Sequence, residues 1–115
     1  ISSIAGIEIT DAPIPYSIAK SALNAYIKNN VKPFAKLGIR INGVAPGNIL
    51  FKGSIWERKI LKNKKRVYDM IASKVAMNRF GIPIEIANAV VFLSSSVSSF
   101  TTGNILVIDG GQVKS

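Results

Sequence analysis

Hydrophobic residues recur along the chain in two kinds of pattern, and the one with a period of three to four residues predicts helices. From Tyr16 to about Leu37, apolar residues recur at steps of three and four, which is the period of an amphipathic helix. Pro33 lies inside this range and would kink the helix or end it early, and Gly38 is suited to its end. The apolar positions of this helix are Ile18, Ala19, Ala22, Leu23, Tyr26, Ile27 and Val31.

Runs of β-branched residues predict strands. Ile39–Ala45 is such a run, and the turn-forming pair Pro46-Gly47 closes it. In Asn104–Asp109, four apolar residues stand in succession, which predicts a strand buried in a parallel sheet rather than a half-exposed one. The first residues, Ile1–Ser3, suit the end of a strand that turns into a loop.

Two further helical segments separate the last two strands. Ser54–Met77 has helical spacing and predicts one or two helices, and another helix is expected from Ile84 to about Ser94. The order of elements predicts an α/β fold in one domain, with an open parallel sheet flanked by helices. Ligands of such sheets lie beyond the carboxyl ends of the strands, where we expect Ser3, Pro46-Gly47 and Asp109-Gly110-Gly111 to meet.

The composition narrows the possible chemistry. The 115 residues include no cysteine and no histidine, which excludes disulfides, cysteine nucleophiles, Ser-His-Asp triads and the common metal sites built on these residues. Tyr, Lys, Asp and Glu are left for proton transfer, and we expect no metal. No apolar run approaches the roughly 20 residues of a membrane span, so we expect no membrane partner and a cytoplasmic location.

The formal net charge is +9, and much of it falls in one stretch. Such a cluster attracts nucleic acid, an acidic protein or a phosphorylated substrate, or it is the solvated face of a surface helix. A basic interaction module is therefore one alternative function. The stretch lacks the interleaved aromatic residues and the helix-turn-helix pattern typical of nucleic-acid binders, so we do not expect a nucleic-acid partner. Its basic residues are Lys52, Arg58, Lys59, Lys62, Lys64, Lys65 and Arg66.

Tyr16 and Lys20 are the first candidates for catalysis. They stand four positions apart on the predicted helix, so they project from one face and the ammonium can act on the phenol. A phenol alone is a poor acid or base at neutral pH, but a neighbouring cation favours its ionised form. Ser3, at a predicted strand end, could donate a hydrogen bond to a substrate oxygen. Because the Tyr-x-x-x-Lys spacing arises often by chance, a core tyrosine beside an exposed lysine stays open as an alternative.

Other motifs along the chain support a catalytic role for Tyr16 and Lys20. In chain order they are Ser3-x-x-Gly6, Tyr16-Ser-Ile-Ala-Lys20-Ser-Ala-Leu, Asn42-Gly-Val-Ala-Pro-Gly47, Arg79-Phe-Gly81 and Thr102-Gly…Asp109-Gly-Gly111. Their order and spacing resemble those of the short-chain dehydrogenase/reductase family, over nearly the whole chain outside roughly residues 51–76. The resemblance implies the C-terminal part of a Rossmann-type doubly wound parallel sheet, in which residues 48–77 form a helical lid over the substrate.

The resemblance also implies a role for each candidate residue in an NAD- or NADP-dependent interconversion of an alcohol and a ketone or aldehyde. Tyr16 would give or take the proton, and Lys20 would favour its phenolate and bind the nicotinamide ribose. Ser3 would orient the substrate oxygen and stabilise charge on it. Pro46-Gly47 would bring main chain close to the nicotinamide, and Ile49 would offer main-chain groups to its carboxamide.

Four parts of the family pattern are missing from this sequence. No Gly-x-x-x-Gly-x-Gly loop for the pyrophosphate occurs, and the residue that selects NAD or NADP and the family's catalytic Asn would both precede Ile1. The threonine that often follows the Pro-Gly pair is also absent, since no residue between Gly47 and Ser54 carries a hydroxyl group. We therefore expect the chain to be a segment, and a catalytically incompetent, truncated family member is a further alternative.

Substrate and assembly follow from the same resemblance. The basic lid would suit a substrate carried on acyl carrier protein or on a sugar nucleotide. The helix from Tyr16 has more apolar surface than one sheet face needs, and the family commonly assembles through it, so we expect a homodimer or homotetramer.

Overall fold

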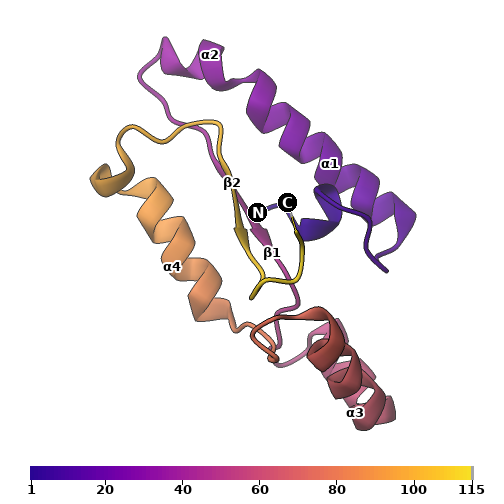
Figure 1. Cartoon of the computed structure of the whole chain (residues 1–115). Coiled ribbons are helices and arrows are strands. Elements are labelled where there is room, and N and C mark those ends of the chain that lie inside the picture. The colour runs from indigo at the N-terminus through magenta and orange to yellow at the C-terminus, as the bar shows by residue number, and fades with distance from the viewer. Residues whose placement is uncertain (115) are drawn as a thin grey trace.

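Two parallel strands with helices beside them form the centre of the computed structural model, which describes residues 1–114 (Figure 1). Strand β1 (Gly43–Pro46) pairs in parallel with β2 (Ile105–Ile108), with Val44 opposite Leu106. Helices α3 (Ile55–Lys74) and α4 (Pro83–Ser94) lie between them in the chain. A helical connection between parallel strands is the α/β crossover, so the predicted α/β class is confirmed.

The predicted helix from Tyr16 to Leu37 is wrong in its start and its continuity. The structure has α1 (Ile14–Asn29) and a short α2 (Val31–Ala35), separated at Asn30 with φ −94° and ψ 1°. The Asn30 side chain donates to the Tyr26 carbonyl oxygen at 2.7 Å, which satisfies a terminal carbonyl of α1. The chain breaks here rather than at Pro33, because Pro33 falls in the first turn of α2, where its missing N–H has no intrahelical partner to lose.

The strands are shorter than predicted because side chains replace the ladder at their starts. Ahead of β1, the Asn42 amide donates to the Thr101 carbonyl oxygen at 2.9 Å and its oxygen accepts from Asn104 N–H at 3.0 Å. No strand forms at residues 1–3, where the expectation is wrong. One main-chain bond, from Ser2 N–H to the Val44 carbonyl oxygen at 2.7 Å, lays this segment beside β1 before the 3-10 helix η1 (Ile4–Gly6) begins.

Helix α4 covers one face of the strand pair. Val44 packs with Ala89 and Leu93, and residues of β2 lie against this cluster. Every residue of β2 is nonetheless half-buried, so the expectation of a fully buried strand is wrong. The reason is geometric: β2 pairs with β1 alone, and α4 packs on one side of the pair.

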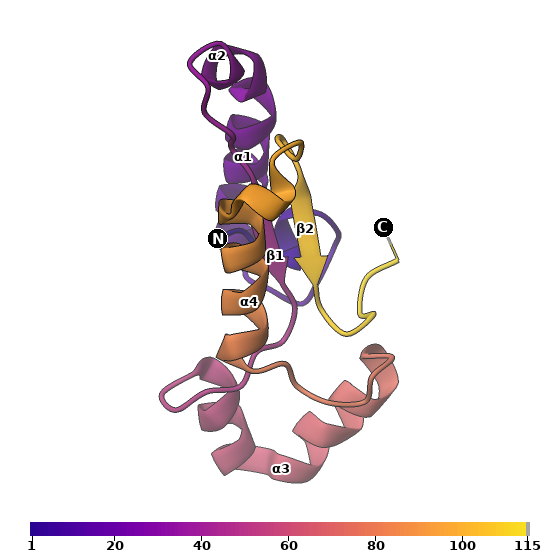
Figure 2. The ribbon, with the colours of Figure 1, turned by 90° about the vertical axis from the view of Figure 1, so that its left-hand side faces the viewer.

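Helix α3 lies at one end of the molecule and is bent (Figure 2). Asn63 has non-helical dihedral angles (φ −157°, ψ 86°), and its side chain accepts from Arg66 N–H at 3.0 Å, which caps the second half. The expectation of one or two helices here is confirmed as two helical halves joined by a kink. Their apolar residues pack with Phe80 around Val67, Ile71 and Val75. Within residues 1–114, none of the helices has the length and apolar character that crossing a membrane requires.

Candidate active site

Helix α1 brings Tyr16 and Lys20 together, as their spacing predicts. The Lys20 ammonium nitrogen lies 5.5 Å from the centroid of the Tyr16 ring. The same nitrogen donates to the Ile1 carbonyl oxygen at 3.0 Å, which ties the helix to the segment beside β1. Tyr16 is 45% exposed, so its phenol is open to a ligand while a cation stands next to it.

The loop that carries Ser3 is fixed on the same helix. The Gly6 carbonyl oxygen accepts from the Ser21 hydroxyl at 3.2 Å and from the Asn24 amide at 3.0 Å. The other end of the Asn24 side chain accepts from the Ser2 hydroxyl at 2.6 Å. One helix side chain therefore holds both ends of the turn in which Ser3 lies.

Gly6 permits this close approach. A Cβ atom at Gly6 would lie 2.7 Å from the Lys20 carbonyl carbon and 2.8 Å from the Lys20 Cβ, closer than such atoms approach in proteins. The loop thus packs directly on the turn of α1 that bears Lys20. The Ser3-x-x-Gly6 motif accordingly sets how near the Ser3 loop comes to Tyr16 and Lys20.

Ser3 is buried and its hydroxyl caps η1. The oxygen accepts from Ala5 N–H at 3.2 Å. A serine hydroxyl has one hydrogen to donate as well as two lone pairs. Among the hydrogen bonds of residues 1–114, that hydrogen has no acceptor, so Ser3 keeps a donor for a ligand oxygen.

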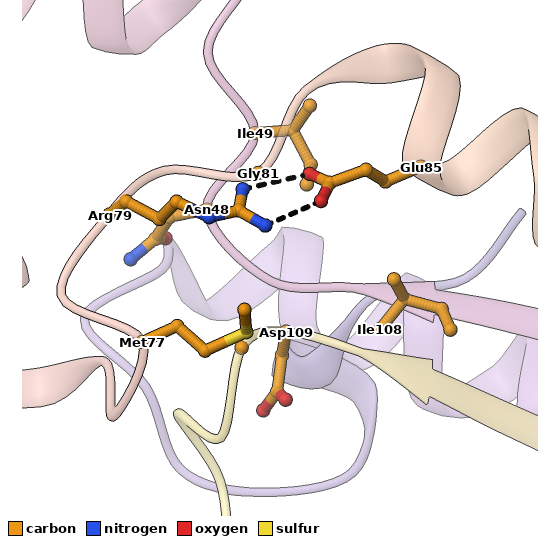
Figure 3. Close-up of a pocket in the computed structure, with 9 residues that line it drawn as sticks. Asn48, Ile49, Met77, Arg79, Gly81, Glu85, Ile108 and Asp109 are labelled. Atoms are coloured by element: carbon orange, nitrogen blue, oxygen red, sulfur yellow. Dashed lines mark hydrogen bonds and ion pairs between the residues drawn. The ribbon is translucent and has the colours of Figure 1, made fainter.

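The carboxyl ends of β1 and β2 meet at a hollow of about 120 Å³ (Figure 3). Gly47 N–H donates to the Ile108 carbonyl oxygen at 3.0 Å, and a Cβ atom at Gly47 would lie 2.7 Å from the Asp109 Cβ. The Pro46-Gly47 turn therefore serves the close contact between the two strand ends. The lining residues are Asn48, Ile49, Met77, Arg79, Gly81, Glu85, Ile108, Asp109 and Gly110.

Ile49 has main-chain groups to spare. Its neighbours make the bridge to Gly81: Gly81 N–H donates to the Asn48 carbonyl oxygen at 3.0 Å and Leu50 N–H donates to the Gly81 carbonyl oxygen at 2.9 Å. In an extended segment, the N–H and C=O of the residue between two such neighbours point the other way. Within residues 1–114, these groups of Ile49 make no main-chain bond, which fits the role that the family resemblance implies for them.

An ion pair closes one side of this hollow (Figure 3). Arg79 donates to both carboxylate oxygens of Glu85, at 2.6 and 3.0 Å, in the two-pronged geometry that favours an ionised carboxylate. These bonds, with a further one from Ile82 N–H at 2.9 Å, lower the pKa of Glu85 to about 2 from its ordinary value of 4.5. Glu85 lies in the first turn of α4, where its carboxylate accepts from the N–H of Ile82 just before the helix, so the Arg79-Phe-Gly81 motif fixes the start of that helix against the pocket.

The structure shows two positioning residues that the sequence reasoning missed, Asn24 and Asp11, and it gives the contacts of a third, Asp109, which the sequence already placed at a strand end. Asn24 lies four positions beyond Lys20, and this continuation of the Tyr16 and Lys20 spacing was the available signal. Asp109 accepts N–H bonds from Gly111, Gln112 and Val113, which fold the tail back over the end of β2. The Asp11 carboxylate pairs with Lys74, whose hydrogen bond and charge lower the pKa of Asp11 and tie the loop before Tyr16 to α3.

The predicted residues thus fall into two groups. Ser3, Tyr16 and Lys20 share the surface of α1 and η1, whereas Pro46-Gly47 and Ile49 lie at the strand ends. The Ser2 bond to Val44 connects the two groups through the main chain. No cluster of His, Cys, Asp or Glu residues that could hold a metal ion occurs in the part of the chain that the structure describes.

Comparisons with known proteins identify the family of this chain. A family model described as Enoyl-(Acyl carrier protein) reductase matches residues 1–112. The 3-oxoacyl-[acyl-carrier-protein] reductase of Thermotoga maritima is 35% identical over 113 residues, which are 98% of this chain and 44% of the relative. The chain belongs to the short-chain dehydrogenase/reductase family.

Solved structures give the same fold. A 4-hydroxyisoleucine dehydrogenase mutant in complex with NADH and succinate superposes with a TM-score of 0.86 at 30% identity, over 97% of this chain and 44% of that one. An NADPH-bound short chain oxidoreductase from Pseudomonas aeruginosa gives 0.87 at 25% identity, over 99% and 44%. The predicted Rossmann-type class is confirmed, and the chain spans less than half the length of these relatives.

Proposed function

We propose that the protein containing this chain is an NAD(P)-dependent oxidoreductase that interconverts an alcohol and a ketone or aldehyde, with residues 1–115 as the C-terminal catalytic portion of one Rossmann-type domain. The observation that carries the proposal is the surface of α1, where an exposed phenol, an ammonium group and a buried serine hydroxyl are held by the same helix. Family membership and the NADH- and NADPH-bound neighbours support it.

Tyr16 is the proton donor in carbonyl reduction and the acceptor in alcohol oxidation. In reduction, its hydroxyl proton passes to the substrate oxygen as that oxygen gains negative charge, and the phenolate remains. The Lys20 ammonium stabilises this phenolate, because an opposite charge nearby favours the ionised form. Ser3 donates its free hydroxyl hydrogen to the same substrate oxygen and stabilises the charge that develops there.

The residues present fit a nicotinamide cofactor in part. Ile49 offers unused main-chain groups beside the strand ends, and the Lys20 ammonium is available to hydroxyl oxygens of a ribose. When bound, the cofactor, NAD or NADP, would supply or accept the hydride. The role of Pro46-Gly47 beside the nicotinamide stays a prediction from the family resemblance, because the contact with Asp109 already accounts for the glycine.

The substrate belongs to the alcohols and carbonyl compounds, and we favour one borne on an acidic carrier or an anionic nucleotide. The 3-oxoacyl-[acyl-carrier-protein] reductase of Thermotoga maritima and the net charge of +9 support this choice. Residues 48–77, which include the strand-end segment and α3, would act as the substrate lid. A cytoplasmic location stays a prediction from the sequence.

Assembly into a homodimer or homotetramer accounts for apolar side chains on α1. Ile14, Ile18 and Tyr26 are 75%, 63% and 54% exposed. Exposed apolar groups grouped on one helix are typical of a surface that another subunit covers. Sedimentation of the complete protein should give a dimer or tetramer, and a strict monomer at micromolar concentration would contradict this assembly.

An absorbance assay tests the proposed activity. The complete protein should oxidise NADH or NADPH when supplied with a 3-oxoacyl thioester or another carbonyl compound, and should reduce the matching coenzyme with the alcohol. If neither coenzyme changes across a panel of carbonyls and alcohols, although the protein is folded, the catalytically incompetent alternative is favoured instead.

A further inference from the structure

Residues 48–77, the lid proposed above, pack around an apolar cluster that contains no residue of the strands or of α4. Val67, Ile71 and Val75 are buried against Phe80 in this cluster. The strands and α4 are held by a second cluster, which is built around Val44. Because the two clusters share no residue, a movement of the lid as a unit would open neither of them. The other residues of the lid cluster are Leu50, Trp56, Ile60 and Met70.

The lid joins the rest of the molecule at a narrow neck. The Asn48 carbonyl oxygen accepts from Gly81 N–H at 3.0 Å, and Leu50 N–H donates to the Gly81 carbonyl oxygen at 2.9 Å, so the entering and leaving segments run side by side. Met77 N–H adds a bond to the Gly110 carbonyl oxygen at 3.0 Å. In Figure 2, α3 lies below the strand pair. Two adjacent segments that connect two separately packed bodies have the arrangement of a hinge.

One ion pair joins the lid to the catalytic side of the molecule. The Lys74 ammonium, in the last turn of α3, pairs with the carboxylate of Asp11, which lies in the loop between η1 and α1 and shortly before Tyr16. Of the three ion pairs among residues 1–114, this pair alone connects α3 with that loop. Both partners are accessible to solvent, since the Lys74 side chain is 45% exposed and the Asp11 side chain 86%. The contact can therefore break without any core being opened.

The surroundings of Asp11 favour this contact. The hydrogen bond from Lys74 and its charge lower the pKa of Asp11, and the charge of Lys59, in the first half of α3, acts in the same direction. The carboxylate is therefore ionised at neutral pH and is attracted by both halves of the bent helix. The loop that carries it is anchored elsewhere, because the Glu8 carboxylate accepts from Lys114 N–H at 3.1 Å.

We propose that Asp11 and Lys74 form a latch that holds the lid against the loop before Tyr16, and that both are positioning residues for the substrate. When the latch is closed, the lid and this loop enclose the substrate together; when it opens, the lid turns at its neck. An exposed ion pair shifts an equilibrium by a factor of only about two to five, which suits a contact that opens whenever substrate enters. The role of the latch rests on the proposed function, whereas the contact itself is testable without turnover.

Amide hydrogen exchange of the complete protein tests whether the latch couples the two segments. Each variant is measured in the segment that it does not alter: Lys74→Gln in residues 7–12, and Asp11→Asn in residues 70–77. Exchange should become about two- to fivefold faster in both segments, because each loses the contact that holds it. The matched control Lys65→Gln removes a lysine that pairs within α3, with Asp69, and should leave residues 7–12 unchanged. Unchanged exchange of residues 7–12 in Lys74→Gln, or equal acceleration by Lys65→Gln, would overturn the latch.

Steady-state kinetics with an uncharged carbonyl substrate test whether the latch positions the substrate. Asp11→Asn should raise KM about two- to fivefold and leave kcat nearly unchanged, because a smaller fraction of the protein has the closed lid. Added salt should raise the KM of the wild type but hardly that of Asp11→Asn, since ions screen an exposed pair. The charge-reversed variant Asp11→Lys/Lys74→Asp should have a lower KM than Asp11→Lys alone. If charge reversal gives no such rescue, the two residues do not act as a pair and the proposal fails.

The two measurements distinguish failure of the latch from failure of the proposed reaction. Faster exchange in the Lys74→Gln and Asp11→Asn variants of a protein that oxidises neither coenzyme would support the coupling of the two segments and overturn the reaction. Wild-type turnover, KM and exchange in both variants would overturn the latch and leave the reaction supported.

Discussion

Substitution of Gly6 by alanine tests how the Ser3 loop is positioned. Gly6 does not have a positive φ, so alanine meets no backbone restriction there and acts through its added carbon alone. That carbon would lie 2.7 Å from the Lys20 carbonyl carbon. An ordinary contact between carbon atoms is about 3.5–4.0 Å, so the two segments must separate by roughly 1 Å. The short loop should yield rather than the 16-residue helix α1.

Two effects follow from this displacement. Overpacking a tight contact costs about 1–3 kcal/mol, which lowers the melting temperature by roughly 2–12 °C for a domain of 150–250 residues. A displacement of about 1 Å in a catalytic constellation reduces turnover on the order of 100-fold. Cofactor affinity should change little, because the Ser3 donor acts on the substrate oxygen.

Steady-state kinetics and calorimetric unfolding of Gly6→Ala measure both effects. Leu93→Ala is the control: it creates a cavity in the core under α4, far along the chain from the Ser3 loop, and costs about 2–5 kcal/mol. Below its melting temperature this control should keep its turnover. If Gly6→Ala loses stability but keeps full turnover, the position of Ser3 does not matter for the reaction and the argument fails.

Three further variants test other contacts. Lys20→Ala should reduce both turnover, measured by kinetics, and cofactor affinity, measured by coenzyme titration, because one ammonium group serves the phenolate and the ribose. A change in the pH optimum alone would argue against the contact between Lys20 and the ribose. The folded-state pKa of Glu85 is about 2 against an ordinary 4.5, so its ionised form stabilises the fold above pH 4.5, and that contribution is lost as the pH falls through 2. Thermal scans should therefore show the advantage of the wild type over Glu85→Gln shrinking from pH 4.5 downward, and a constant difference would argue against the Arg79 pair. Asn24→Ala should free the turn around Ser3 and lower turnover more than Asn29→Ala, whose side chain bonds only within α1.

The sequence predicts the elements of this fold better than it predicts their ends. Apolar periodicity indicates α1, α3 and α4, although on α1 the structure buries Ile27 and leaves Ile18 and Tyr26 exposed. The break between α1 and α2 depends on the Asn30 side chain and its bond to Tyr26, which periodicity does not contain. The burial of β2 could not be predicted either, because it depends on which neighbours cover the strand and not on the strand's own residues.

The candidate site shows the same division. The spacing of Tyr16 and Lys20 on a helix predicts their contact, and the structure confirms it at 5.5 Å. The attachment of the Ser3 loop to Asn24 arises from tertiary contacts between residues that are 18 and 22 positions apart. Local patterns cannot give such contacts, so the role of Asn24 became visible only in three dimensions.

The assignment of proton transfer to Tyr16 is the central claim, and single-turnover kinetics of Tyr16→Phe test it most directly. In this assay each complete protein is loaded with reduced coenzyme and mixed with a carbonyl substrate, and the coenzyme absorbance is followed. The matched control is Tyr26→Phe, whose ring lies farther along α1, and its absorbance should change on the wild-type time scale. Tyr16→Phe should bind the coenzyme with nearly wild-type affinity and show a loss of at least about 100-fold in the rate, because only the transferable proton is removed. A Tyr16→Phe protein that turns over at the rate of Tyr26→Phe would contradict the account.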